Sequence, residues 1–118
     1  MSAAPAATPL SDADYHARAY AVLDRIEARV DQWLEDDLVD IDSHRSGGLL
    51  ELSFPNGSKI IINTQPPLQE LWLAARSGGY HFRFCDGAWL DTRSSTEFHA
   101  LLSAQASAQA GQDLSFSV

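Results

Sequence analysis

Acidic residues are concentrated in one short stretch of the sequence, residues 24–42, which reads DRIEARVDQWLEDDLVDID. Within this acidic stretch only Arg25 and Arg29 oppose the carboxylates, so its charge is −8 + 2 = −6, whereas the whole chain carries −8. Carboxylate oxygens are hard ligands that suit Mg²⁺, Ca²⁺, Mn²⁺, Fe²⁺ and Fe³⁺. We therefore predict a weak, open site for a hard cation, or a docking surface for a basic partner, whose candidate residues are Asp24, Glu27, Asp31, Glu35, Asp36, Asp37, Asp40 and Asp42.

The first four of these acids belong to a predicted helix. Apolar residues recur at three- and four-residue spacings between Tyr15 and Leu34, which indicates a helix of about 25 residues, opened by a capping pair at Ser11 and Asp14. At about 100° per residue, its acids form a stripe along one side of the apolar face. The other side of that face carries Arg18, Arg25 and Arg29.

The spacing of the acids is unfavourable for an isolated helix. Carboxylates three or four positions apart destabilise a helix by about 0.2–0.5 kcal/mol per pair. Residues 35–37 also lie at the negative end of the helix dipole, where cations are preferred. A bound cation or a basic partner would offset this cost, and solvation by water is the alternative explanation.

The rest of the sequence predicts about six strands followed by a second helix. The strands are expected at residues 38–44, 48–54, 59–65, 68–75, 80–85 and 88–92, and the helix is expected to begin at a capping box, Ser94 to Glu97, and to end before Gly111. Because the connecting turns are short, neighbouring strands should pair antiparallel. We predict a two-layer α+β sandwich with both helices on one face of the sheet, formed by residues 11–118 after a disordered lead at residues 1–10.

The two-residue period of the strands assigns polar and aromatic residues to the sheet face that the helices leave open. Asn63 and Gln65 alternate with inward-facing isoleucines, and Trp72 alternates with inward-facing leucines. An exposed tryptophan beside polar side chains is typical of an anchor for a protein partner. The alternative interpretation is that Trp72 only shields the sheet backbone from water.

Several classes of function receive no support from the sequence. No segment approaches the ~20 apolar residues of a membrane span, and the N-terminal residues lack the features of a signal peptide, so we expect a cytoplasmic protein. The negative charge argues against a nucleic-acid partner. We also expect no enzyme, because the sequence has no phosphate-binding loop, nucleophile elbow or HExxH motif. One catalytic hypothesis remains, in which Cys85 is a nucleophile and His81 its base, because the two residues share one strand face.

Residues 56–82 read NGSKIIINTQPPLQELWLAARSGGYHF, and this segment resembles the core signature of the frataxin family in its bacterial CyaY-type form. The resemblance extends over nearly all of residues 11–116. It implies an α+β sandwich that binds Fe²⁺ or Fe³⁺ weakly at its surface and docks on the cysteine desulfurase and the scaffold protein of iron–sulfur cluster assembly. By position, it implies partner contacts at Asn63, Gln65 and Trp72, and an acidic ridge formed by Glu27, Asp31, Asp36, Asp37, Asp40 and Asp42.

The chain departs from the family pattern at several positions. Ala28, Gln32 and Leu34 occupy ridge positions that are often acidic, and His44 also stands where an acid is common. Since residues 35–37 add acids at the junction after the helix, we expect iron nearer the helix end. The resemblance implies an iron donor or regulator, which we expect to be a monomer or an iron-dependent oligomer. A ferroxidase and a metal-independent acidic interaction module remain the alternatives.

Overall fold

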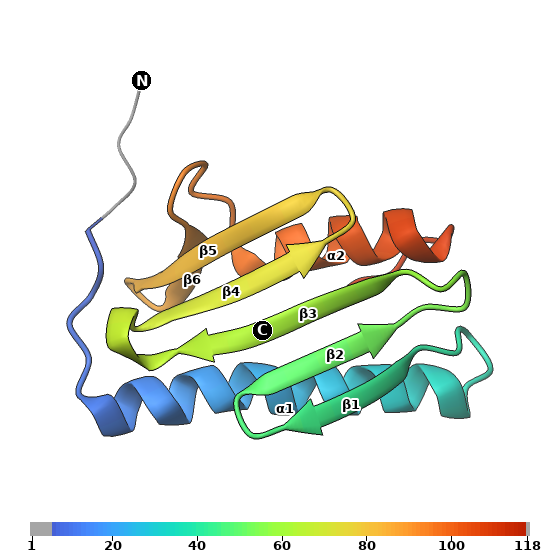
Figure 1. Ribbon diagram of the computed structural model, residues 1–118, viewed down its shortest axis with the longest axis horizontal. Coiled ribbons are helices and arrows are strands. Elements are labelled where there is room, and N and C mark those ends of the chain that lie inside the picture. Colours follow the sequence, from blue (N-terminus) through green and yellow to red (C-terminus); the bar gives the residue numbers. More distant parts are fainter. Residues whose placement is uncertain (1–5, 118) are drawn as a thin grey trace.

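The structure, a computed structural model, describes residues 6–117 and shows helices packed on one side of a sheet (Figure 1). Within these residues the chain forms α1 (Asp12–Glu35), β1 (Asp42–Ser46), β2 (Leu49–Ser53), β3 (Lys59–Gln65), the short 3₁₀ helix η1 (Pro66–Leu68), β4 (Glu70–Ala75), β5 (Gly78–Cys85), β6 (Ala88–Asp91) and α2 (Phe98–Ala110). No helix in this part of the chain is long and apolar enough to cross a membrane.

The described strands form an antiparallel sheet in which each strand pairs with its neighbours in the sequence, from β1 at one edge to β6 at the other. The turn at residues 55–58 reverses the chain between β2 and β3, with Gly57 at φ +87°, a left-handed value that glycine adopts without strain. Both helices cover the same face of the sheet (Figure 1). The predicted two-layer α+β sandwich is confirmed.

The apolar core lies between the helices and the covered face of the sheet. In α2, Phe98 packs edge-on against Phe82 of β5, with ring centroids 5.0 Å apart. Leu114 and Phe116 of the C-terminal segment are also buried, so this segment packs on the domain. The buried residues of α1 follow the predicted spacing and fix which sides of the helix stay exposed: they are Tyr15, Ala19, Val22, Leu23, Ile26, Val30 and Trp33.

The predicted first strand, residues 38–44, begins too early. Its first residues instead complete the turn that ends α1, since the Leu38 N–H donates to the Trp33 carbonyl at 2.9 Å. Pairing with β2 starts only at Asp42. Asp40 therefore lies in the connection between α1 and β1 rather than on a strand, which corrects its predicted position.

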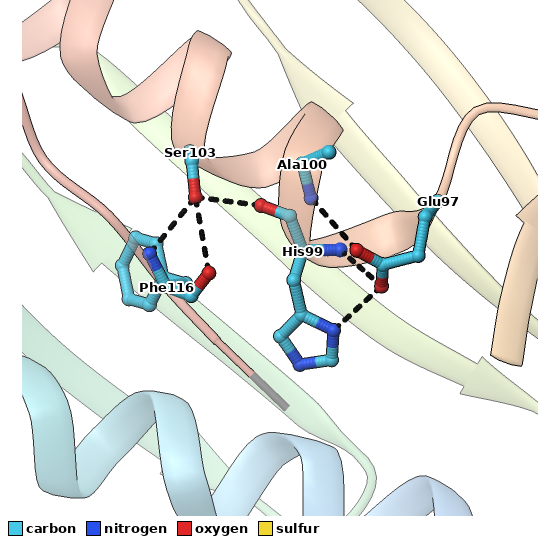
Figure 2. A network of polar contacts seen from close by, with 5 residues as sticks. All are labelled: Glu97, His99, Ala100, Ser103 and Phe116. Atoms are coloured by element: carbon cyan, nitrogen blue, oxygen red, sulfur yellow. Dashed lines mark hydrogen bonds and ion pairs between the residues drawn. The ribbon is translucent and has the colours of Figure 1, made fainter.

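The second helix begins at Phe98, four residues later than predicted. Glu97 is its N-cap, because its carboxylate accepts hydrogen bonds from the backbone N–H groups of His99 at 2.7 Å and Ala100 at 3.1 Å (Figure 2). The Ser94 hydroxyl instead donates to a carboxylate at the end of β6, at 2.7 Å. The predicted capping box is therefore wrong, and Glu97 caps the helix from the preceding loop.

The residues just before α1 contact the domain. The Thr8 N–H donates to the Phe84 carbonyl, and the Thr8 hydroxyl accepts from the Asp86 N–H, both at 2.8 Å. The Gln69 side chain donates to the Leu10 carbonyl at 3.0 Å. The prediction of a disordered lead over residues 1–10 is therefore wrong for this part, and residues 1–5 lie outside the described chain.

Candidate functional site

The acidic stretch lies along α1 and along the connection from α1 to the edge strand β1. Asp24 and Glu27 lie on the side of α1 nearer β1, since both contact Arg45 of that strand. At the start of β1, Asp42 points to the open side of the sheet, because the next residue pairs with the inward-facing Leu52. The carboxylates therefore form a band along one edge of the molecule.

Arg45 offsets the charge of the first two acids in this band. Its Nη1 donates to Asp24 Oδ1 at 2.9 Å and to Glu27 Oε1 at 2.5 Å, and its Nε donates to the Gly47 carbonyl at 2.6 Å. Burial alone would lower the pKa of the guanidinium, but the hydrogen bonds to the two carboxylates outweigh burial and raise that pKa. The predicted site does not include Arg45, although the alternation of side chains along β1 turns the Arg45 side chain toward α1.

The remaining candidate carboxylates are accessible to a ligand. Asp36 accepts a hydrogen bond from Gln32 Nε2 at 3.1 Å. No three His, Cys, Asp or Glu side chains within residues 6–117 are placed to hold a metal ion together. The geometry therefore suits a hydrated ion held by one or two carboxylates rather than a closed metal centre. Within the described chain, the candidates that are exposed and form no ion pair are Asp31, Glu35, Asp36, Asp37, Asp40 and Asp42.

Trp72 lies on the open face of the sheet, as the strand period predicts. It pairs with Asn63 of β3 on one side and His81 of β5 on the other. Its ring stacks on the His81 ring, with centroids 4.2 Å apart and an interplanar angle of 5°, so Trp72 is half-buried rather than fully exposed. Gln65 lies two residues further along β3 than Asn63, opposite Glu70 of β4. The three predicted partner-contacting residues are thus neighbours on one surface.

Glu70 lies next to Trp72 on the same face of β4. Only 8% of its surface is exposed, and its carboxylate accepts from Trp72 Nε1 at 2.9 Å. The side chains of His81 and Arg83 approach the same carboxylate at 3.8 and 3.7 Å. Asn63 Oδ1 is buried beside this group and has no hydrogen-bond partner among the described residues. Glu70 therefore fixes the orientation of the Trp72 ring.

The hypothesis that Cys85 and His81 form a nucleophile and its base is wrong. Four positions along a strand separate their Cα atoms by about 13 Å. The Cys85 side chain is buried and lies 3.8 Å from the Arg83 carbonyl, and burial raises the pKa of its thiol. His81 instead contacts Glu70 and Trp72.

Comparison with known proteins identifies the family. The family model for the frataxin-like domain matches residues 8–112. The chain belongs to the frataxin family. An iron–sulfur cluster assembly protein CyaY from Burkholderia mallei is 54% identical over 108 residues, which cover 92% of this chain and 99% of the relative. A CyaY from Paraburkholderia phymatum is 55% identical over 103 residues, covering 87% and 94%.

Solved structures of frataxins share the fold. Frataxin from Psychromonas ingrahamii superposes with a TM-score of 0.74 at 32% identity, covering 92% of this chain and all of the other. Trimeric yeast frataxin complexed with ferrous iron gives a TM-score of 0.68 at 24% identity, covering 92% and 93%, and supports the fold alone. The site residues expected from the frataxin resemblance remain predictions for this chain.

Proposed function

We propose that this frataxin is an iron-binding protein of iron–sulfur cluster assembly, which carries iron on its acidic stretch and docks on a cysteine desulfurase and its scaffold protein. The observation that carries the proposal is the 54% identity, over 99% of its length, to a relative named for iron–sulfur cluster assembly. We expect a cytoplasmic binding protein rather than an enzyme, acting as a monomer that iron can assemble into oligomers.

The donor set of the acidic stretch suits iron as a cargo. Hard carboxylate oxygens bind Fe²⁺ and Fe³⁺ without selecting a soft metal. Asp31 and Glu35 are four positions apart on α1, which places their Cβ atoms about 5–6 Å apart and lets both approach one ion. Iron bound by so few protein ligands keeps most of its water and exchanges readily. Such a site is suited to delivering iron or to sensing its concentration.

The same carboxylates form a surface that a basic partner would recognise. A band of exposed negative charge accelerates association with a positive surface and orients it. We expect the desulfurase to bind this band and the scaffold to bind the face around Trp72. Because iron and the desulfurase would use shared carboxylates, their binding should be competitive.

The proposal is tested by capturing the cognate desulfurase and scaffold on the immobilised protein, with and without Fe²⁺, and by assaying desulfurase activity in the same mixtures. We expect saturable binding, weakened by Fe²⁺, and a change in desulfurase rate. Amide resonances perturbed by Fe²⁺ should be confined to residues 31–42. The absence of both partner binding and resonance changes would contradict the proposal. Partner binding without any iron response would favour the metal-independent interaction module.

A separate measurement distinguishes iron binding from ferroxidase activity. Fe²⁺ is added without oxygen at several ratios to protein, and oxygen is then admitted while Fe³⁺ formation is followed. We expect oxidation to stop at the amount of bound iron. Repeated oxidation well beyond that amount would show that the protein is a ferroxidase.

Replacing Arg45 with Gln is expected to tighten Fe²⁺ binding about threefold, because a positive charge beside Asp24 and Glu27 is removed. The free energy of unfolding should fall by only about 1 kcal/mol, since Asp24 is 69% exposed and water screens the pair. Calorimetric titration and urea denaturation measure the two effects. The control is Arg93→Gln, which removes the same charge in the loop after β6. Weaker iron binding in Arg45→Gln alone would mean that Arg45 positions the ligands.

A further inference from the structure

The arginines of α1 lie on the side of the helix away from the acidic stretch, and this side faces α2. Arg25 and Arg29 are one helical turn apart, with the small Ala28 beside them. Together with His99 of α2 and Ser117 of the C-terminal segment, they line a hollow of about 410 Å³, which we call the α1–α2 groove. Pockets that bind small molecules usually measure about 300–1,000 Å³. The groove therefore has room for a small ligand.

Two of the residues that line the groove are arginines, while the nearest acid, Glu97, lines the adjoining hollow. Neither Arg25 nor Arg29 forms an ion pair with any residue in the described range. Among residues 6–117, no Asp or Glu lines the groove. Arg18 differs, because its guanidinium lies 4.7 Å from the Phe84 ring centroid in a smaller adjoining hollow. The α1–α2 groove is thus an electropositive site on a protein whose net charge is −8.

His99 adds a buried ring nitrogen to this site. The residue is 5% exposed, and its Nδ1 lies 2.8 Å from Glu97 Oε2, so Nδ1 carries a proton because a carboxylate only accepts. Figure 2 shows the other ring nitrogen, Nε2, turned away from Glu97. This Nε2 atom is buried and has no hydrogen-bond partner in the part of the chain that the structure describes. Buried polar atoms are normally paired, so Nε2 is suited to a ligand in the groove.

The Glu97 carboxylate holds the His99 ring in one orientation. Burial by itself would raise the pKa of the Glu97 carboxyl, but hydrogen bonds from the backbone and ring of His99 outweigh burial and hold that pKa below its ordinary value. Glu97 is therefore ionised at neutral pH. The ionised carboxylate accepts the Nδ1 proton of His99, so Nε2 is the ring atom left for a ligand.

We propose that the α1–α2 groove binds a small oxyanion with two or more negative charges, of the phosphate or dicarboxylate class, held by Arg25, Arg29 and His99. The two guanidiniums offer the forked donors that match paired oxygens. His99 presents Nε2 from the opposite wall, where it can accept from a hydroxyl group of the anion, such as that of hydrogen phosphate. The groove lies on the other side of α1 from the acidic stretch. This second site does not depend on the function proposed above.

The binding is tested by titrating the full chain separately with inorganic phosphate and with succinate, while the side-chain nitrogen resonances of histidine and arginine are recorded. At least one anion should shift the His99 Nε2 resonance and the Arg25 and Arg29 Nε resonances with a single dissociation constant. A response to only one anion assigns the ligand to that class. No saturable shift with either anion, up to tens of millimolar, would overturn the proposal.

Variants separate this site from general attraction between charges. The double variant Arg25→Gln/Arg29→Gln should weaken anion binding about 100-fold, since each charged hydrogen bond contributes roughly a factor of ten. Arg76→Gln, in the turn between β4 and β5, also removes an exposed arginine and should have no effect on anion affinity. Equal weakening in Arg76→Gln would show only non-specific attraction and would contradict the proposal.

His99→Asn tests the ring nitrogen itself. Asparagine retains a short side-chain N–H that can donate to Glu97, but it lacks an atom at the position of Nε2. We expect about tenfold weaker anion binding and unchanged Fe²⁺ binding, with the melting temperature reported alongside. Unchanged anion affinity in the folded variant would remove His99 from the site. A change in Fe²⁺ affinity would contradict the independence of the two sites.

Discussion

Reversing three carboxylates of the acidic stretch, in the variant Asp31→Lys/Asp36→Lys/Asp37→Lys, is expected to weaken Fe²⁺ binding about 100-fold. Each reversal changes the local charge by two. For a divalent ion about 7 Å from each side-chain charge in water, each reversal lowers the binding free energy by about 1 kcal/mol after salt screening. Three reversals therefore cost about 3 kcal/mol of binding free energy. The three residues are exposed and form no ion pair with a described residue, so the effect on the free energy of unfolding should be small.

The same variant should lose binding to the desulfurase, with an effect that shrinks as the salt concentration rises. The matched control is Asp12→Lys/Asp14→Lys/Asp86→Lys, which makes the same change in net charge at exposed positions outside the acidic stretch. Two of these lie in the first turn of α1, where carboxylates are favourable, so its unfolding is measured first. Unchanged iron and desulfurase affinities in a folded Asp31/Asp36/Asp37 variant would contradict the proposed role of the acidic stretch.

Replacing Trp72 with Ala is expected to weaken binding to the scaffold protein about 30-fold or more. Tryptophans at the centre of an interface commonly contribute 2 kcal/mol or more to binding, roughly a factor of 30. Trp72 is suited to this role because stacking on His81 and the hydrogen bond to Glu70 already fix its ring. Little side-chain freedom would then be lost on binding. Calorimetric titration with the scaffold measures the effect.

The control is Trp72→Phe, which keeps an aromatic ring against His81 but removes the N–H that Glu70 accepts. We expect this variant to lose only a few-fold in scaffold affinity. Iron binding should be the same in both Trp72 variants, since the acidic stretch lies at the edge of the sheet beyond β1. If Trp72→Ala lowers the melting temperature but leaves scaffold affinity unchanged, Trp72 only shields the sheet backbone.

Features that follow from local backbone periodicity could be predicted from the sequence. The three- and four-residue spacing of α1 separates its acids from its arginines, because successive residues of a helix are about 100° apart. The alternation of β3 and β4 likewise places Asn63 and Trp72 on the same open face. Both assignments hold whatever packs against these elements. The fold class followed from the same patterns, since short turns make neighbouring strands antiparallel.

Which of these residues contact one another depends on how the helices and strands pack together. Arg45 binds Asp24 across 21 positions in the sequence, and Glu70 accepts a hydrogen bond from the Trp72 ring. Because β1 begins only at Asp42, Asp40 lies in the connection after α1 and not on the predicted strand. Packing also buries His99 and places its ring at the α1–α2 groove. These contacts depend on the distances between elements that the core sets, and no local pattern in the sequence specifies such distances.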